Sequence, residues 1–152
     1  MLQDSIILKN RHLKFIETVT ESELVYGLKS KNGLATSNST QLEEDNGNPI
    51  EMICFWAEKA RAKSCAQDQW IKYKVTEIPL AEFIENWCVG MERDGLLTGI
   101  QFDQNLFGYE VEPLDLIFEL TTELKSKGKN LKFRKYNGIA DLEEQVKRIV
   151  NE

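Results

Sequence analysis

The side chains that most often carry nucleophilic or metal chemistry are scarce in this chain, which has one histidine and three cysteines. A single imidazole excludes a site built from several histidines, and a Ser-His-Asp or Cys-His site is possible only through His12. His12 falls on the apolar side of a predicted helix, which favours a core or boundary position. Cys54, Cys65 and Cys88 lack the C-x-x-C spacing of zinc and redox sites, so we expect three buried, reduced thiols.

Carboxylates are abundant, with 25 Asp and Glu residues. Glu110 and Glu112 flank Val111 on a predicted strand and therefore share one face. A catalytic pair must be partly buried, with its two pKa values pushed apart. We favour a solvated face, which makes Glu110 and Glu112 candidates for contact with a partner.

Phosphate-binding and calcium-binding signatures are missing from the sequence. The glycines between Gly90 and Gly108 are too widely spaced for a phosphate loop, and neither G-x-x-x-x-G-K-[ST] nor G-x-G-x-x-G occurs. Asp103-Gln104-Asn105 begins like a calcium loop, but the glycine and the terminal glutamate that such a loop requires are misplaced. The sequence predicts no cofactor and no metal.

Tryptophan is the remaining residue type that often dominates binding surfaces. Trp87 lies on the apolar stripe of a predicted helix and is assigned to the core. Trp56 and Trp70 bracket an alanine-rich segment, and the core is favoured for both because tryptophan is usually buried. The alternative is that one of them is partly exposed and anchors a partner.

Charge is unevenly distributed along the chain, whose net charge is −6. Residues 125–137 hold six bases and no acid, while the other positions carry 13 bases against 25 acids, a net charge of −12. An acidic body disfavours nucleic-acid binding, which needs bases that neutralise phosphates. We interpret Lys125 to Lys135 as a solvated connector.

The periodicity of the apolar residues predicts helices alternating with hairpins, which indicates an α+β fold: an antiparallel or mixed sheet built from hairpins, with helices packed on it and a C-terminal helical extension. Asn32-Gly33 is a type I′ hairpin signal, Pro79 and Pro113 open helices, and Gly95 ends one. The predicted helices cover 5–19, 57–69, 79–94, 113–124 and 139–150, and the predicted extended segments cover 23–40, 51–56, 70–78, 96–111 and 131–134.

The length of 152 residues suits a single domain over 1–152. Residues 121–152 form its basic connector and last helix. No apolar run is long enough for a transmembrane helix, and the N-terminus lacks the basic start and apolar stretch of a signal peptide. We expect a soluble, cytoplasmic protein without membrane contact.

A spaced pattern of aromatics, glycines and acids runs through the middle of the chain. Its members are Phe55-Trp56-Ala57-Glu58, Ala60, Cys65, Trp70, Ile78-Pro79-Leu80-Ala81-Glu82-Phe83, Trp87, Met91-Glu92-Arg93-Asp94-Gly95-Leu96-Leu97, Gly99, Asn105, Gly108 and Glu112-Pro113. This pattern, with the start at Phe15-Ile16-Glu17 and Asn32-Gly33, resembles the bacterial DUF2750 family over about residues 10–118. The resemblance implies an α+β fold and carries over no activity, cofactor or catalytic residue.

The leading functional hypothesis is a non-enzymatic binding or adaptor domain that recognises another protein. A specific version is an immunity-like protein whose acidic face blocks a basic partner. One alternative is a small enzyme with an acidic cleft that the sequence does not reveal. A second alternative is nucleic-acid contact by the basic segment, and the oligomeric state stays open.

Overall fold

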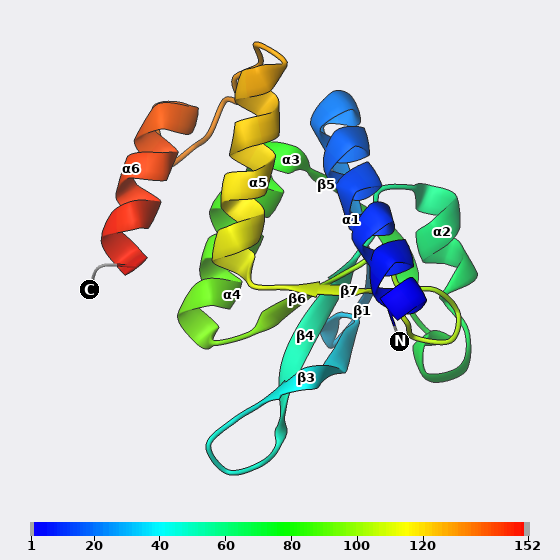
Figure 1. The fold of residues 1–152 in the computed structure, drawn as a ribbon. Coiled ribbons are helices and arrows are strands. Elements are labelled where there is room, and N and C mark those ends of the chain that lie inside the picture. Colours follow the sequence, from blue (N-terminus) through cyan, green and yellow to red (C-terminus); the bar gives the residue numbers. More distant parts are fainter. Residues whose placement is uncertain (1, 151–152) are drawn as a thin grey trace.

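The computed structural model describes residues 2–150 and confirms an α+β fold with two sheets (Figure 1). One sheet has the strand order β2-β1-β5 and is antiparallel, while the other has the order β3-β4-β6-β7 and contains a parallel β4/β6 pair. The strands are β1 (Leu24–Ser30), β2 (Gly33–Leu34), β3 (Thr36–Glu43), β4 (Pro49–Phe55), β5 (Lys74–Pro79), β6 (Leu97–Ile100) and β7 (Tyr109–Val111). The helices are α1 (Leu2–Ser22), α2 (Lys59–Ser64), η1 (Asp68–Trp70), α3 (Leu80–Glu82), η2 (Phe83–Cys88), α4 (Val89–Asp94), α5 (Pro113–Ser126) and α6 (Ile139–Val150).

The predicted hairpin over 23–40 is only partly confirmed, because its second strand changes sheets at Ala35. The Ala35 N–H donates to Leu28 of β1, while its carbonyl accepts the Cys54 N–H of β4. The short β2 therefore pairs with β1, and β3 pairs with β4. Gly33 has a φ of +112°, but Asn32 does not have a positive φ. The prediction of a type I′ turn is therefore wrong.

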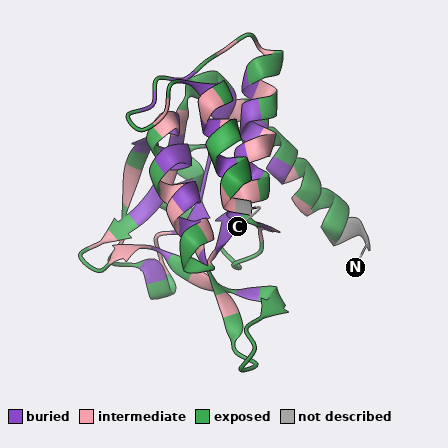
Figure 2. Cartoon of the chain, turned by 90° about the vertical axis from the view of Figure 1, so that its left-hand side faces the viewer, coloured by how far each residue is buried: buried purple, intermediate pink, exposed green. Residues whose placement is uncertain are grey.

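Helices α1, α5 and α6 stand beside one another above the four-stranded sheet, with α5 between the other two (Figure 1). Their inward positions, among them Phe15, Leu120 and Leu142, join one core cluster with the sheet. The loop joining β3 to β4 projects from this body and is exposed (Figure 2). Within residues 2–150, no helix combines the length and the apolar composition that crossing a membrane demands.

The predicted helix over 79–94 exists, but its middle turn, η2, is π-helical. A π turn takes in an extra residue, so the apolar stripe shifts by one position. Cys88 and Val89 are therefore buried, and Trp87, which was assigned to the core, is only half-buried beside Phe55. The helix ends at Gly95 in the left-handed conformation, as predicted.

The predicted helix over 57–69 and the predicted strand over 70–78 are both shorter in the structure. Helix α2 ends at Ser64, and the following Cys65 is buried, with its thiol donating to the Phe102 carbonyl. Trp70 lies in the 3₁₀ turn η1, and the strand begins only at Lys74. Ile71 is consequently exposed instead of facing the sheet.

No strand forms over 131–134, where the alternation of apolar and basic residues predicted one. Leu131 and Phe133 are buried as the pattern requires, but the backbone N–H groups of Arg134 and Lys135 donate to the buried carboxylate of Glu85. This side chain replaces a neighbouring strand as hydrogen-bond partner.

The basic segment is also less solvated than predicted. Lys127 donates to the carbonyl of Glu17, and Lys129 donates to the carbonyls of Thr20 and Glu21. Both ammonium groups thus complement the C-terminal end of α1.

Candidate functional site

A groove runs between α1 and α5 and consists of two adjoining hollows of about 540 and 680 Å³. Both hollows include Leu13 of α1 and Glu123 of α5, so they form one continuous surface. The lining residues are Leu13, Ile16, Glu17, Thr18, Glu21, Ser22, Asp115, Phe118, Glu119, Thr122, Glu123 and Lys127. We call this surface the α1/α5 groove.

Acidic side chains dominate the rim of the α1/α5 groove. Asp115, Glu119 and Glu123 follow one another at four-residue spacing along α5, which places them on one face of that helix. Glu17 and Glu21 stand opposite on α1, at the same spacing. Five carboxylates thus line the groove against one base, Lys127.

Three of these carboxylates have no ion pair in the described part of the chain: Glu17, Asp115 and Glu123. Glu21 lies 3.4 Å from the Lys127 ammonium, and Glu119 contacts His12. Unpaired carboxylates beside one another on a helix repel. A cation from another molecule would relieve that repulsion.

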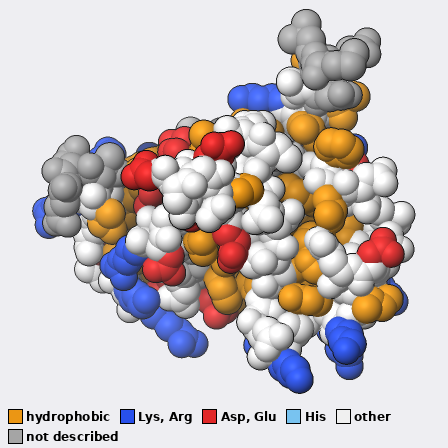
Figure 3. All heavy atoms as spheres, turned by 90° about the horizontal axis from the view of Figure 1, so that it is seen from below, with side chains coloured by type: hydrophobic (Ala, Val, Ile, Leu, Met, Phe, Trp, Pro, Cys, Tyr) orange, Lys and Arg blue, Asp and Glu red, His pale blue; other side chains and the backbone are white. Residues whose placement is uncertain are grey.

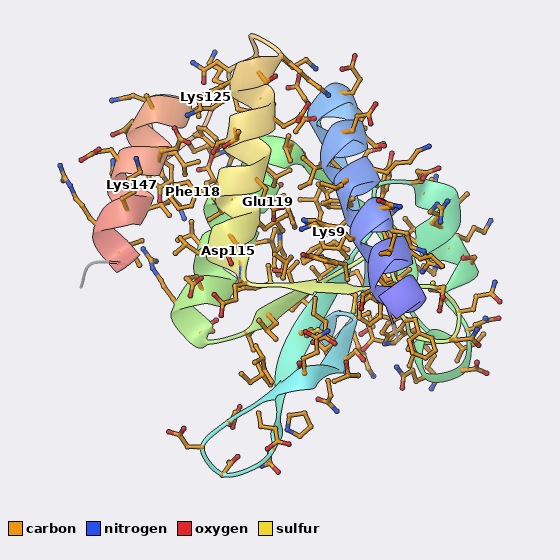
Figure 4. All side chains as sticks on the ribbon, viewed as in Figure 1. Lys9, Asp115, Phe118, Glu119, Lys125 and Lys147 are labelled. Carbon is orange, nitrogen blue, oxygen red and sulfur yellow. The ribbon has the colours of Figure 1, made fainter. Side chains whose placement is uncertain are left out.

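The floor of the groove is apolar. Ile16 is buried and Phe118 is half-buried against the main core, while Leu13 is 52% exposed. In Figure 4, Asp115 and Glu119 stand with Phe118 along α5. An apolar floor with a charged rim is suited to an amphipathic ligand.

His12 lies beside the groove and is fully buried. Its ring stacks on Tyr109 with the centroids 4.2 Å apart, and its Nε2 lies 3.0 Å from both carboxylate oxygens of Glu119. Its Nδ1 is buried and has no hydrogen-bond partner among the described residues. Because Nε2 faces a carboxylate, this nitrogen carries the proton and holds Glu119 in place.

The candidate residues chosen from the sequence do not line the groove. Trp56 and Trp70 are 0% and 3% exposed and pack edge to face, with ring centroids 6.0 Å apart. They belong to the second core cluster, as the favoured interpretation held, and offer no exposed ring to a partner. Glu112 is exposed at the start of α5, and Glu110 accepts hydrogen bonds from Ser39 and Thr40.

The three thiols are also placed in the interior. Cys54, Cys65 and Cys88 are free and buried, as predicted. Burial raises the pKa of each thiol above its ordinary value. A raised pKa keeps a thiol protonated and poorly nucleophilic, which makes these cysteines packing residues.

Other exposed apolar side chains lie away from the groove. Figure 3, seen from below, shows apolar side chains gathered over the right half of that face, while charges of both signs occupy the left. The exposed large apolar residues are Ile6, Ile7, Leu13, Leu42, Ile71, Leu106 and Phe107. Of these, Leu13 alone lines the α1/α5 groove.

The comparisons with known proteins identify the family. The family model described as "Protein of unknown function (DUF2750)" matches residues 12–120. The match includes the second half of α1 and, on α5, the groove residues Asp115, Phe118 and Glu119. Searches of curated proteins and of solved structures gave no match. The family match covers well over half of the 152 residues, and the chain therefore belongs to the DUF2750 family.

Proposed function

We propose that this protein is a non-enzymatic binding domain whose α1/α5 groove receives a basic amphipathic helix of another protein. The observation that carries the proposal is the excess of carboxylates over an apolar floor, five acids against one base. Lysines and arginines of the partner would meet Glu17, Asp115 and Glu123, which lack ion pairs among the described residues. Apolar residues of the same helix would cover Leu13 and Phe118.

Electrostatic complementarity supports an immunity-like role, in which the domain occludes the basic surface of its partner. Complementary charge accelerates association and selects against acidic competitors. The remainder of the chain outside residues 125–137 carries a net charge of −12, which extends this preference beyond the groove. We place the protein in the cytoplasm, in keeping with its free thiols.

The test is a titration of the ¹⁵N-labelled protein with a synthetic helical peptide of leucine and lysine. We expect saturable chemical-shift changes on the facing residues of α1 and α5, with an affinity that falls as salt is added. The variant Asp115→Lys with Glu123→Lys should lose binding, because it replaces two attractive charges by two repulsive ones. Neither carboxylate has an ion pair within the described residues that the substitution would remove. The matched control, Glu44→Lys with Asp45→Lys, makes the same charge change in the exposed β3–β4 loop and should bind like the parent. Equal affinity of the two variants would show that the groove is not the binding surface.

A small enzyme with an acidic cleft is the second candidate, and one observation favours it. The Glu119 carboxylate is oriented by His12 at 3.0 Å and its side chain remains 34% exposed to the groove. The two functions differ in which acids matter. If the groove binds a partner, neutralising Asp115 and Glu123 together should weaken function more than Glu119→Gln does. If the protein is an enzyme, Glu119→Gln should weaken function more than that double neutralisation.

A further inference from the structure

A separate hollow, of about 300 Å³, lies where α1 meets α2 and the residue that follows β6. We call it the α1/α2 hollow. It shares no lining residue with the α1/α5 groove. Its volume is at the lower end of the range for small-molecule sites. The lining residues are Ile7, Asn10, Arg11, Lys14, Glu58, Arg61 and Gln101.

Gln101 is the buried polar group of this hollow, with 5% of its surface exposed. Its backbone has a φ of +56°, a conformation that non-glycine residues rarely adopt and that clusters at functional sites. Its N–H donates to the Phe55 carbonyl at 3.0 Å, and its side-chain Oε1 accepts the Ala57 N–H at 2.8 Å. The hydrogen bond to Ala57 therefore fixes the side chain beside the segment that joins β4 to α2.

The Ala57 contact also fixes which way the carboxamide points. Because Oε1 accepts a backbone N–H, the NH₂ group must occupy the other end of the amide. Within the described residues Nε2 donates no hydrogen bond, and it is not among the buried atoms without a partner, so solvent reaches it at the hollow that Gln101 lines. Two N–H donors on a buried side chain are thus left for a ligand.

Three cations line the same hollow as this carboxamide: Arg11 and Lys14 from α1, and Arg61 from α2. Glu58, the one acid in the lining, pairs with Arg61 at 3.0 Å, and Asp103 outside the lining lies 3.4 Å from Arg11. Lys14 has no ion pair in the part of the chain that the structure describes. The lining therefore has a net charge of +2 in a chain whose net charge is −6.

We propose that this hollow binds the oxyanion of a small organic molecule, either a carboxylate or a phosphate monoester. Gln101 Nε2 donates to the oxyanion from a fixed position, and the Arg11 and Arg61 guanidinium groups suit the geometry of either anion. Ile7, half-exposed at the edge, provides an apolar wall for the organic part of the ligand. The site is independent of the α1/α5 groove and of the protein partner proposed for it.

The experiment is an NMR titration of the ¹⁵N-labelled protein with inorganic phosphate and, separately, with acetate, at constant ionic strength. We expect saturable shifts of the Gln101 side-chain NH₂ and of the Ala57 amide. Arg61→Gln should weaken binding by about tenfold, the usual loss for one charge-assisted hydrogen bond. Lys63→Gln, which removes the same charge from the exposed face of the same helix, should bind like the parent.

Gln101→Glu is the sharpest variant, because it keeps the oxygen that accepts the Ala57 N–H and replaces the two donors by a negative charge. It should abolish binding, as followed at the Ala57 amide. If Gln101→Glu does not fold, the comparison of Arg61→Gln with Lys63→Gln decides, since both positions are exposed.

The two titrations also separate the ligand classes. Tighter binding of phosphate indicates a phosphate monoester, and tighter binding of acetate indicates a carboxylate. Linear, non-saturating shifts with both ions, or equal weakening by Arg61→Gln and Lys63→Gln, would overturn the proposal, because either result means that the ions only screen surface charge.

Discussion

Each ring nitrogen of His12 has a different environment, and this explains what the residue does. Nε2 faces both oxygens of Glu119 at 3.0 Å, whereas Nδ1 is buried and finds no partner in the described part of the chain. The ring as a whole stacks on Tyr109. The sequence predicted a core or boundary histidine from helical periodicity, which the burial confirms. It could not predict Glu119, because that contact joins residues 107 positions apart.

Two tryptophans should differ in what they contribute to stability. Trp56 is fully buried and its Nε1 donates to the Phe102 carbonyl at 2.8 Å, so Trp56→Ala should lower the free energy of unfolding by about 3–5 kcal/mol. Trp87 is half-buried beside the π turn, so Trp87→Ala should lower it by only about 1–2 kcal/mol. Urea denaturation measures both values. Equal losses, or a larger loss for Trp87, would mean that the apolar stripe is not shifted.

At the scale of elements, the sequence predicted those whose signals are local. Pro113 opens α5, Gly95 ends α4, and the last helix begins and ends where the apolar period does. The sequence-based prediction was wrong where tertiary contacts determine the structure. The chain passes from one sheet to the other at Ala35, and the Arg134 N–H donates to the Glu85 carboxylate instead of to a neighbouring strand.

The candidate sites show the same division between local and long-range signals. The four-residue spacing of Asp115, Glu119 and Glu123 is visible in the sequence and marks one face of a helix. That this face meets α1 across a groove is a tertiary fact. The α1/α2 hollow is lined by residues of α1, α2 and the end of β6, so no short stretch of sequence contains it.

Two glycines should respond oppositely to alanine. A Cβ at Gly108 would overlap the ring of Phe102, which is buried in the second core cluster, so Gly108→Ala should cost about 1–3 kcal/mol. Among the described residues, a Cβ at Gly90, within α4, meets no atom within 4 Å beyond its chain neighbours and the backbone of its own helix, so Gly90→Ala should stabilise by about 0.5–1 kcal/mol through helix propensity. Thermal melting of both variants checks the signs. A melting temperature for Gly108→Ala at or above that of the parent would contradict the close packing against Phe102.

Docking of α6 should depend on pH through Glu143. Burial alone raises the pKa of this carboxyl, but hydrogen bonds from Lys125 and Thr121 outweigh it and hold the pKa below its ordinary value of 4.5. The stabilisation is therefore complete above pH 4.5 and is lost as pH falls through the lowered pKa.

Glu143→Gln should accordingly be less stable than the parent at neutral pH, and the difference should shrink in acid. Denaturant midpoints across this pH range measure it. Glu144→Gln, one position along on the exposed side of α6, is the matched control and should follow the parent. A constant gap between Glu143→Gln and the parent at every pH would contradict the prediction.

At the scale of the whole molecule, the lysines of the basic segment contact both α1 and α6 and help to hold these helices in place. Lys125 pairs with Glu143 at 2.9 Å, and Lys127 and Lys129 bind the end of α1. We therefore expect no saturable binding of single-stranded DNA or RNA near physiological salt, because few bases remain and the acidic body repels phosphate. Fluorescence titration tests this. Micromolar binding that weakens steeply with salt, and vanishes when Lys132, Arg134 and Lys135 are changed to Glu, would refute it.

The C-terminal segment lies outside the family match, yet it completes the main core. Its buried apolar residues each contribute about 1.5–3 kcal/mol, and together they rival the roughly 5–15 kcal/mol that stabilises a whole domain. These residues are Leu131, Phe133, Ile139, Leu142 and Val146. A chain that stops after Ser126 should therefore lose its cooperative unfolding transition and bind a hydrophobic dye.

A point-mutant pair tests the same contribution without removing any backbone. Leu142→Ala with Val146→Ala should lower the free energy of unfolding by roughly 3–6 kcal/mol, because both side chains are at most 1% exposed and pack into the core cluster. Glu144→Ala with Lys147→Ala changes two exposed positions of the same helix and should shift it by less than about 1 kcal/mol. In the chain truncated after Ser126, helix α5 would expose the side that α6 covers (Figure 4). If the truncated chain unfolds cooperatively at the parent's midpoint, α6 is an appendage, and the family-matched residues form a complete core without it.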